Sequence, residues 1–247
     1  GLNMDQKDYI LKVTDLKTEF AVGKKRVHAV NGVSFGLERG KTLCVVGESG
    51  CGKSQTAHSI MQLLARNGYI AGGAVEYYPN HGCAPIELTS MRRNSKAMCK
   101  IRGKEISMIF QDPMSSLNPV YTVGSQIEEM LRKHEKLSKK EARARIVKLL
   151  EELGIPNPEA RYDQFPHEFS GGMKQRIMIA IAMICNPKVL IADEPTTALD
   201  VTIQAQILDL IRKMQREYGT SVIFITHNMG VVAEIADDVA VMYMGRI

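Results

Sequence analysis

The segment Gly47–Ser54 has residue types and a spacing suited to holding phosphate. It reads Gly-Glu-Ser-Gly-Cys-Gly-Lys-Ser and matches the pattern G-x-x-x-x-G-K-[ST]. It follows an apolar run and opens a helical pattern, so its glycines can fold into a nest of backbone N–H groups at a helix N-terminus. Lys53 would then reach the β- and γ-phosphates of a nucleotide, and Ser54 would bind Mg²⁺.

Two carboxylates follow an apolar run in the last third of the chain. The run Val189–Ala192 precedes Asp193 and Glu194, and ligands of α/β proteins bind at the carboxyl ends of such strands. Asp193 would support Mg²⁺ through water, and Glu194 would polarise the attacking water as general base. Alone, the pattern also fits a strand that ends in exposed acids, but the phosphate loop favours a catalytic site. His227 follows another apolar run and could bond the γ-phosphate, although a lone histidine is more often structural.

Short apolar runs separated by helical patterns predict the elements that position these residues. Continuous apolar strands are typical of a parallel sheet covered on both faces. We expect strands at 42–46, 105–110, 189–192, 221–226 and 239–244, and helices at 53–64, 202–218 and 229–236. Further strands are expected at 27–37 and, in an antiparallel arrangement, at 74–78, whereas residues 79–100 give no clear pattern.

A helical block interrupts this alternation. Residues 123–153 have helical periodicity, with Ser138 and Glu141 forming a capping box. Another helix is expected at about 170–185. The pattern therefore predicts an α/β protein whose parallel-sheet core carries an inserted helical subdomain at about 113–170.

Composition narrows the class of protein. The 247 residues are 45% hydrophobic and 24% charged, which is ordinary for a globular chain and excludes whole-chain disorder. There is no apolar run long enough to span a membrane and no apolar signal core at the start. The net charge of +5 suits an anionic ligand or a lipid surface without indicating nucleic acid. Five scattered cysteines without C-x-x-C favour a reduced, cytosolic setting over a disulfide framework or a zinc site.

The order of the motifs resembles the nucleotide-binding subunit of ABC transporters over nearly the whole chain. The matching segments are the phosphate loop Gly47–Ser54, the Q-loop residue Gln111, the signature Phe169–Arg176, the Walker B pair Asp193–Glu194, the D-loop Ala198–Asp200 and the switch histidine His227. The signature departs from the commonest form, Leu-Ser-Gly-Gly-Gln, at Phe169 and Met173. Ser170, Gly171 and Gly172 remain, and they supply a hydroxyl and close-approach backbone at a helix start.

This resemblance implies a P-loop NTPase fold of the ABC ATPase type. Its expected parts are a RecA-like core, an antiparallel β subdomain and an inserted helical subdomain. We expect one domain over residues 4–247, with the ATP-binding core at about 4–112 and 171–247 and the helical subdomain at about 113–170.

The resemblance also implies ATP and Mg²⁺ as cofactors, with each ATP held between two subunits. Phe20 aligns with the aromatic A-loop position and could stack on adenine, the alternative being an ordinary core or loop Phe. The expected catalytic residues are Glu194, His227, Lys53 and Gln111, and the expected metal ligands are Ser54, Gln111 and Asp193. The expected nucleotide contacts are Phe20, Gly47, Glu48, Ser49, Gly50, Cys51, Gly52, Lys53, Ser54, Gln55, Ser170, Gly171, Gly172 and Asp200.

Three segments resemble one branch of the family, the importers of dipeptides, oligopeptides and nickel. These segments are Glu48–Gly50, Phe110–Pro119 and Thr196–Thr202. The branch implies a second ABC ATPase subunit as partner, either a paralogue or an identical copy. It also implies two membrane permease subunits and, indirectly, an extracytoplasmic peptide-binding protein, with no nucleic acid. The chain would act peripherally at the cytoplasmic face of the cell membrane.

Alternatives remain at this stage. The cargo could be a dipeptide, a longer peptide or nickel, and the chain could instead be a soluble ABC-type ATPase that acts on nucleic acid or the ribosome. The lack of a second ATPase cassette speaks against the soluble ATPase. The branch commonly carries a C-terminal extension with clustered cysteines, which this sequence lacks, and we expect a truncated chain.

The stretch Arg132–Lys148 is strongly basic, with eight Lys or Arg against two Glu. We interpret this stretch first as the solvent-exposed face of a helix. The alternative is attraction to anionic lipid headgroups beside the permease.

Overall fold

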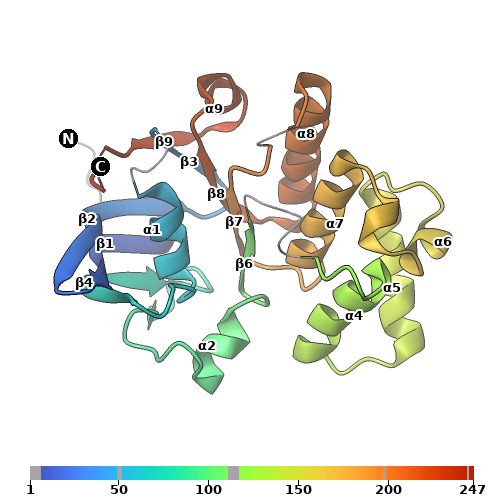
Figure 1. Ribbon diagram of the computed structural model, residues 1–247, viewed down its shortest axis with the longest axis horizontal. Helices are drawn as coiled ribbons and strands as arrows, with labels where there is room; N and C mark the ends of the chain where they lie inside the picture. The colour runs from blue at the N-terminus through green and yellow to red at the C-terminus, as the bar shows by residue number, and fades with distance from the viewer. Residues whose placement is uncertain (1–6, 49–51, 111–116, 197–198, 244) are drawn as a thin grey trace.

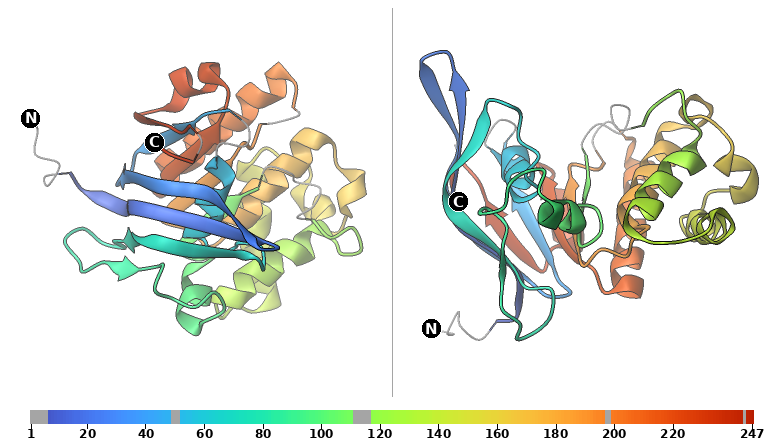
Figure 2. Two further views of the ribbon diagram at one scale, coloured as in Figure 1. Left: turned by 60° about the vertical axis from the view of Figure 1, so that its left-hand side comes forward. Right: turned by 90° about the horizontal axis from the view of Figure 1, so that it is seen from below.

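The computed structural model describes residues 7–48, 52–110, 117–196, 199–243 and 245–247. An antiparallel sheet, a parallel sheet and a group of helices lie side by side as layers (Figure 1, Figure 2). With the labels of Figure 1, the described elements in chain order are β1 (Tyr9–Val22), β2 (Lys25–Glu38), β3 (Thr42–Val46), α1 (Lys53–Ile60), β4 (Gly68–Tyr77), β5 (Ile86–Glu87), α2 (Lys96–Ile101), β6 (Ile106–Ile109), α4 (Val123–His134), α5 (Lys139–Glu152), α6 (Pro158–Tyr162), η2 (Pro166–Glu168), α7 (Gly171–Met183), β7 (Val189–Asp193), α8 (Val201–Tyr218), β8 (Ser221–Thr226), α9 (Met229–Ile235) and β9 (Asp238–Val241).

The parallel sheet forms the centre of the molecule. Its strand order is β6-β7-β8-β3-β9, and every strand pair in it is parallel. All residues of β3, β7 and β8 are buried, because alternate side chains enter two different cores. Leu43 and Val45 of β3 pack on the side of the antiparallel sheet, whereas Cys44 and Val46 pack on the side of the helices. This two-sided burial explains the continuous apolar runs that predicted the strands.

The antiparallel sheet, of order β2-β1-β4-β5, is built on a long hairpin of β1 and β2. Its turn contains Gly23 with φ 63°, a left-handed conformation that glycine adopts without a Cβ penalty. Helix α1 lies between this sheet and the parallel sheet (Figure 1). The hydroxyls of Thr18 in β1 and Ser59 in α1 share a hydrogen bond of 2.7 Å, so the hairpin is tied directly to the helix that follows the phosphate loop.

The helical layer covers the opposite face of the parallel sheet. Helices α4, α5, α6 and α7 share one apolar core with that face. The helical block expected over 123–153 consists of two helices, since α4 ends before Glu135 and α5 begins after the predicted cap Ser138. The Ser138 side chain accepts a hydrogen bond of 3.2 Å from the backbone N–H of Glu141, as the N-cap prediction required.

The two boundaries that differ most from the expected ones do so for local backbone reasons. Helix α1 ends at Ile60 rather than near residue 64, because Gln62 has φ 55°, outside the helical region. Strand β4 begins at Gly68 rather than at the expected residue 74. Gly73 has φ 86°, and a Cβ there would lie 2.3 Å from the Asp15 carbonyl oxygen, so it permits an irregular step in the β1–β4 pairing.

Candidate active site

The turn from β3 to α1 carries the phosphate-loop motif. Gly52 precedes α1 with φ 96°, and a Cβ at this position would lie 2.5 Å from the Ala29 carbonyl oxygen. The Gly52 carbonyl accepts hydrogen bonds of 2.9 Å from both the N–H and the hydroxyl of Thr56. Only glycine fits this position, and it places the N-terminus of α1 at Lys53. Ser49, Gly50 and Cys51 lie outside the described residues.

Lys53 is a buried cation at the start of α1. Its Nζ donates a hydrogen bond to the Gly47 carbonyl and lies 3.7 Å from Oε1 of Glu194. The two side chains are 5% and 8% exposed. A buried ammonium needs anionic or carbonyl oxygens around it, so this position is suited to a phosphate oxygen beside the helix N-terminus.

Asp193 ends β7 opposite Ser54 of α1. The Ser54 hydroxyl donates a hydrogen bond of 3.1 Å to Oδ1 of Asp193. Burial raises the pKa of Asp193, and the hydrogen bond from Ser54 opposes that rise. A hydroxyl and a carboxylate are oxygen ligands that suit a hard cation such as Mg²⁺. Among the described residues there is no group of three or more His, Cys, Asp or Glu side chains that could hold a metal ion.

Glu194 and His227 meet where β7 and β8 end side by side. Nδ1 of His227 lies 2.6 Å from Oε1 of Glu194. Glu194 has φ 44°, an uncommon left-handed conformation for a residue other than glycine, and its N–H donates to the Ile225 carbonyl at 2.9 Å. This backbone conformation turns the carboxylate out of the strand alternation and towards Lys53 and His227.

A second histidine near the site was missed by the sequence analysis. His58 lies one helical turn after Ser54 in α1, and its ring stacks on Phe110 with a centroid distance of 6.2 Å and an interplanar angle of 28°. Positive charge on His58 acts to lower the pKa of Asp193. The i, i+4 spacing from Ser54 was the available signal. Phe110 directly precedes Gln111, which lies outside the described residues.

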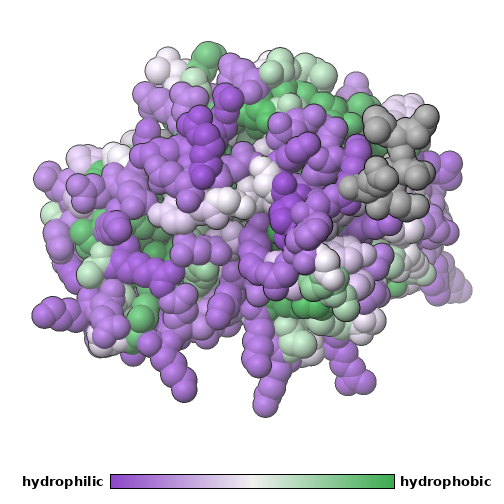
Figure 3. All heavy atoms as spheres, turned by 180° about the vertical axis from the view of Figure 1, so that it is seen from behind, coloured by the Kyte–Doolittle hydropathy of each residue, from purple (hydrophilic) through white to green (hydrophobic). Residues whose placement is uncertain are grey.

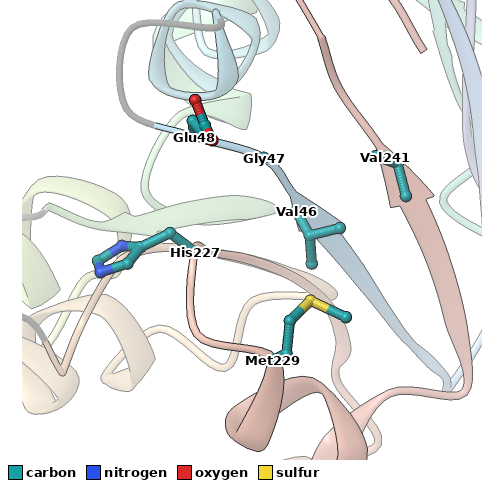
Figure 4. Close-up of a pocket in the computed structure, with 6 residues that line it drawn as sticks. All are labelled: Val46, Gly47, Glu48, His227, Met229 and Val241. Atoms are coloured by element: carbon teal, nitrogen blue, oxygen red, sulfur yellow. The ribbon is translucent and has the colours of Figure 1, made fainter.

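A pocket of about 500 Å³ lies beside His227 and the start of the phosphate loop (Figure 4). It is lined by Val46, Gly47, Glu48, His227, Met229 and Val241. The Met229 side chain points towards Val46, so this pocket is mainly apolar on that side (Figure 4). It borders the start of the phosphate loop, and its lining does not include Lys53, Ser54 or Asp193.

The signature residues form a separate part of the surface. Ser170 caps α7, accepting a hydrogen bond of 3.3 Å from the N–H of Met173, and both Ser170 and Gly171 are exposed. Gly172 packs against the start of α8, where a Cβ would lie 3.1 Å from Cγ2 of Ile203. Asp200 caps α8 by accepting 2.9 Å from the N–H of Ile203.

The expected site residues therefore fall into two groups. Within the described parts of the chain, contacts join Gly47, Lys53, Ser54, Asp193, Glu194 and His227 into one cluster. The exposed residues of the signature and the D-loop form no hydrogen bond or ion pair with that cluster among the described residues. The same is true of Phe20. Its ring packs over Gly68, where an added Cβ would lie 2.6 Å from Cε1 of Phe20. Gln55 is a half-buried residue of α1.

Sequence comparison finds relatives along most of the chain. The family model described as ABC transporter matches residues 30–197. The oligopeptide transport ATP-binding protein OppD of Bacillus subtilis (strain 168) is 55% identical over 96% of this chain and 64% of its own length. The dipeptide transport ATP-binding protein DppD of the same strain is 52% identical over 96% and 69%. OppD of Escherichia coli (strain K12) is 50% identical over 99% and 70%. The chain thus spans 64–70% of the length of these relatives.

Comparison with solved structures finds proteins of the same fold. The ATP-binding cassette MJ0796, in a dimeric post-hydrolysis state bound to ADP and Pi, matches with a TM-score of 0.82 and 26% identity over 96% of each chain. The cbiO1 protein from Clostridium perfringens, part of the ABC transporter complex cbiONQ, matches with a TM-score of 0.77 and 31% identity over 97% of this chain and 87% of that one.

Proposed function

The chain belongs to the ABC transporter family, as its motifs predicted, and from this premise we propose that it is the ATP-binding subunit of a peptide importer. In this role it hydrolyses Mg-ATP and drives transport through membrane permease subunits. The observation that carries the proposal is the convergence of Lys53 and His227 on one carboxylate oxygen of Glu194, beside Gly47 of the phosphate loop.

The chemistry proposed is transfer of the γ-phosphoryl group to water. Lys53 and the amides at the start of α1 hold the phosphates, where positive charge stabilises the transition state. Glu194 accepts a proton from the attacking water, and its buried position keeps the carboxylate close to the phosphate. His227 bonds the Glu194 carboxylate and is exposed enough to contact the γ-phosphate as well.

Ser54 and Asp193 are the proposed Mg²⁺ ligands, with Gln111 as a third that lies outside the described residues. Mg²⁺ in such a site neutralises phosphate charge when bound. The hydrogen bond between the two described ligands supports the assignment, because it already holds both oxygens on the same side of α1.

The exposed position of Ser170 and Gly171 supports a site shared between two subunits. In the proposed dimer, each signature reaches the nucleotide on the other subunit, and the second subunit is a paralogue or an identical copy. The dimeric, ADP-bound state of MJ0796 supports this arrangement by analogy. The adenine contact of Phe20 is proposed on the A-loop resemblance, with closure of the dimer completing the site.

Peptide is the proposed cargo because the names of three relatives specify oligopeptide or dipeptide transport. The proposed partners are two permease subunits and, indirectly, an extracytoplasmic binding protein, with the chain at the cytoplasmic face of the membrane. None of the helices in the described part of the chain is both long and apolar enough to cross a bilayer.

The test is affinity purification of the protein from detergent-solubilised native membranes, followed by an ATPase assay of the complex. We expect two polytopic membrane proteins and a second ATPase to co-purify, with phosphate release that stops on chelation of Mg²⁺ and is stimulated by a peptide-loaded binding protein. Recovery of ribosomal proteins or DNA without a permease would overturn the transport role. Stimulation by a nickel-loaded binding protein alone would overturn the cargo.

A further inference from the structure

Two basic segments that are distant in sequence meet at one edge of the molecule. Residues 92–104 contain six Lys or Arg and no acid, and residues 132–140 contain five Lys or Arg and a single acid, Glu135. The segments touch at Gly103, where an added Cβ would lie 3.1 Å from Nε2 of His134. Lys104 and Lys133 both act to lower the pKa of His134, after the larger effect of burial, as expected if the positive charges are close together.

The arginines and lysines of these segments have different roles. Arg93 and Arg102 donate hydrogen bonds to backbone carbonyls, and Arg132 pairs with Glu128 at 3.4 Å. The acid Glu135 forms an ion pair with Arg145. Within the described residues, hydrogen bonds and ion pairs thus engage these three arginines and Glu135, whereas the lysines of the two segments form no ion pair.

Seven lysines define what we name the basic edge: Lys96, Lys100, Lys104, Lys133, Lys136, Lys139 and Lys140. All seven are exposed, and within the described parts of the chain none forms an ion pair. They lie on α2, on the turn before β6, and around the α4–α5 connection, which share the lower part of the molecule in Figure 1. Long hydrophilic side chains project from this lower edge in the space-filling view (Figure 3).

The chemistry of the basic edge fits a diffuse anionic surface. Lysine is a strongly hydrated point charge on a flexible stem, and such charges bind anionic lipid layers by long-range attraction without a shaped pocket. Nucleic acid is disfavoured, because the two segments contain no Phe, Tyr or Trp on which bases could stack.

We propose that the basic edge docks on the anionic phospholipid headgroups of the membrane. The proposal rests on the proposed function only for the presence of a membrane nearby. The edge would hold the helical layer against the lipid beside the permease, in addition to direct contacts between subunits.

The test measures co-sedimentation of the purified chain with two kinds of vesicle. One consists of phosphatidylcholine alone, and the other of phosphatidylcholine with about 30% phosphatidylglycerol. The test variant is K100E/K104E/K133E, and the matched control is K12E/K24E/K25E, which reverses the same charge at exposed lysines of the β1–β2 hairpin. We expect the wild type and the control to bind the anionic vesicles, and the test variant to bind them at least about tenfold more weakly. High salt should abolish binding, because exposed charges are screened.

Three results would overturn the proposal: no preference of the wild type for anionic vesicles, equal loss in both variants, or retention of wild-type binding by the test variant. Binding to heparin without binding to vesicles would also overturn it. Thermal unfolding of each variant, measured without lipid, shows whether a loss of vesicle binding comes from a folding defect. ATPase activity, also measured without lipid, shows whether the proposed function fails independently of lipid binding.

Discussion

One carboxylate oxygen of Glu194 is shared by Lys53 and His227: Oε1 lies 3.7 Å from Lys53 Nζ and 2.6 Å from His227 Nδ1. In this arrangement the cation and the imidazole occupy the oxygen that would accept a proton from water. A γ-phosphate beside Lys53 would compete for the cation, because the phosphate carries more negative charge than the carboxylate. Nucleotide binding is therefore expected to release Glu194 for its role as general base.

Replacing Glu194 by Gln tests that role. E194Q keeps the side-chain size and can still contact His227, but an amide cannot accept the proton. We expect steady-state phosphate release to fall at least about 100-fold while ATP binding is retained. Binding of a fluorescent ATP analogue and release of phosphate measure the two properties. The control is E234Q on the exposed side of α9, which should leave both unchanged. Undiminished turnover in E194Q would refute the assignment of the base.

Replacing Ser170 by Ala separates a structural role from a functional one. Ser170 and Ser138 are both N-caps that accept one backbone hydrogen bond, at 3.3 and 3.2 Å. S170A and S138A should each lower the free energy of unfolding by about 1 kcal/mol. Only S170A should also lose ATPase activity, because only Ser170 is proposed to contact nucleotide on a second subunit. Equal ATPase rates in the two variants would limit Ser170 to capping.

Replacing Gly52 by Ala tests the geometry of the phosphate loop. G40A is the matched control, since Gly40 has φ 76° but nothing within 4 Å of an added Cβ. G40A should cost about 1–2 kcal/mol from the left-handed conformation alone. G52A should cost at least about 1 kcal/mol more, because its Cβ meets the Ala29 carbonyl. Urea unfolding of both variants gives the comparison, and equal losses would contradict the close approach at Gly52.

His134 makes stability depend on pH. Burial, followed by Lys133 and Lys104, lowers its pKa below the ordinary value of 6.5. Since the unfolded chain then binds a proton more readily than the folded chain, the free energy of unfolding should fall as pH drops through 6.5 towards the folded pKa. H134Q should reduce that fall, whereas H167Q at an exposed position should not. Urea unfolding between about pH 7 and pH 5 measures it, and identical pH slopes in H134Q and the wild type would refute the role.

The sequence predicted most accurately those strands in which every residue is buried. Thr42–Val46 and Ser221–Thr226 are fully buried strands, and both were predicted with the observed bounds. Residues 79–100 gave no pattern because their regular structure is limited to the two-residue β5 and most of the six-residue α2. Such short elements are held by contacts from elsewhere, such as the hydrogen bond from Gln62 to the Leu88 carbonyl.

The chemical types in the site were predictable, but its contacts were not. Motif spacing named Lys53, Asp193, Glu194 and His227, because strand ends in a parallel sheet lie along one edge. The shared oxygen depends on the φ of 44° at Glu194, which no sequence pattern indicates for a glutamate. The stacking of His58 on Phe110 likewise depends on where the tertiary fold places α1 relative to the residue that follows β6.

The strand order also determines when the site can form during synthesis. β3, which leads into the phosphate loop, pairs with β8 and β9, both of which come from the far end of the described chain. As the chain leaves the ribosome, the apolar β3 therefore keeps both edges unpaired until residues beyond Ser221 have been made. Pairings so distant in sequence fold slowly, and open apolar strands aggregate. A nascent chain stopped before Ser221 is thus expected to need chaperone protection.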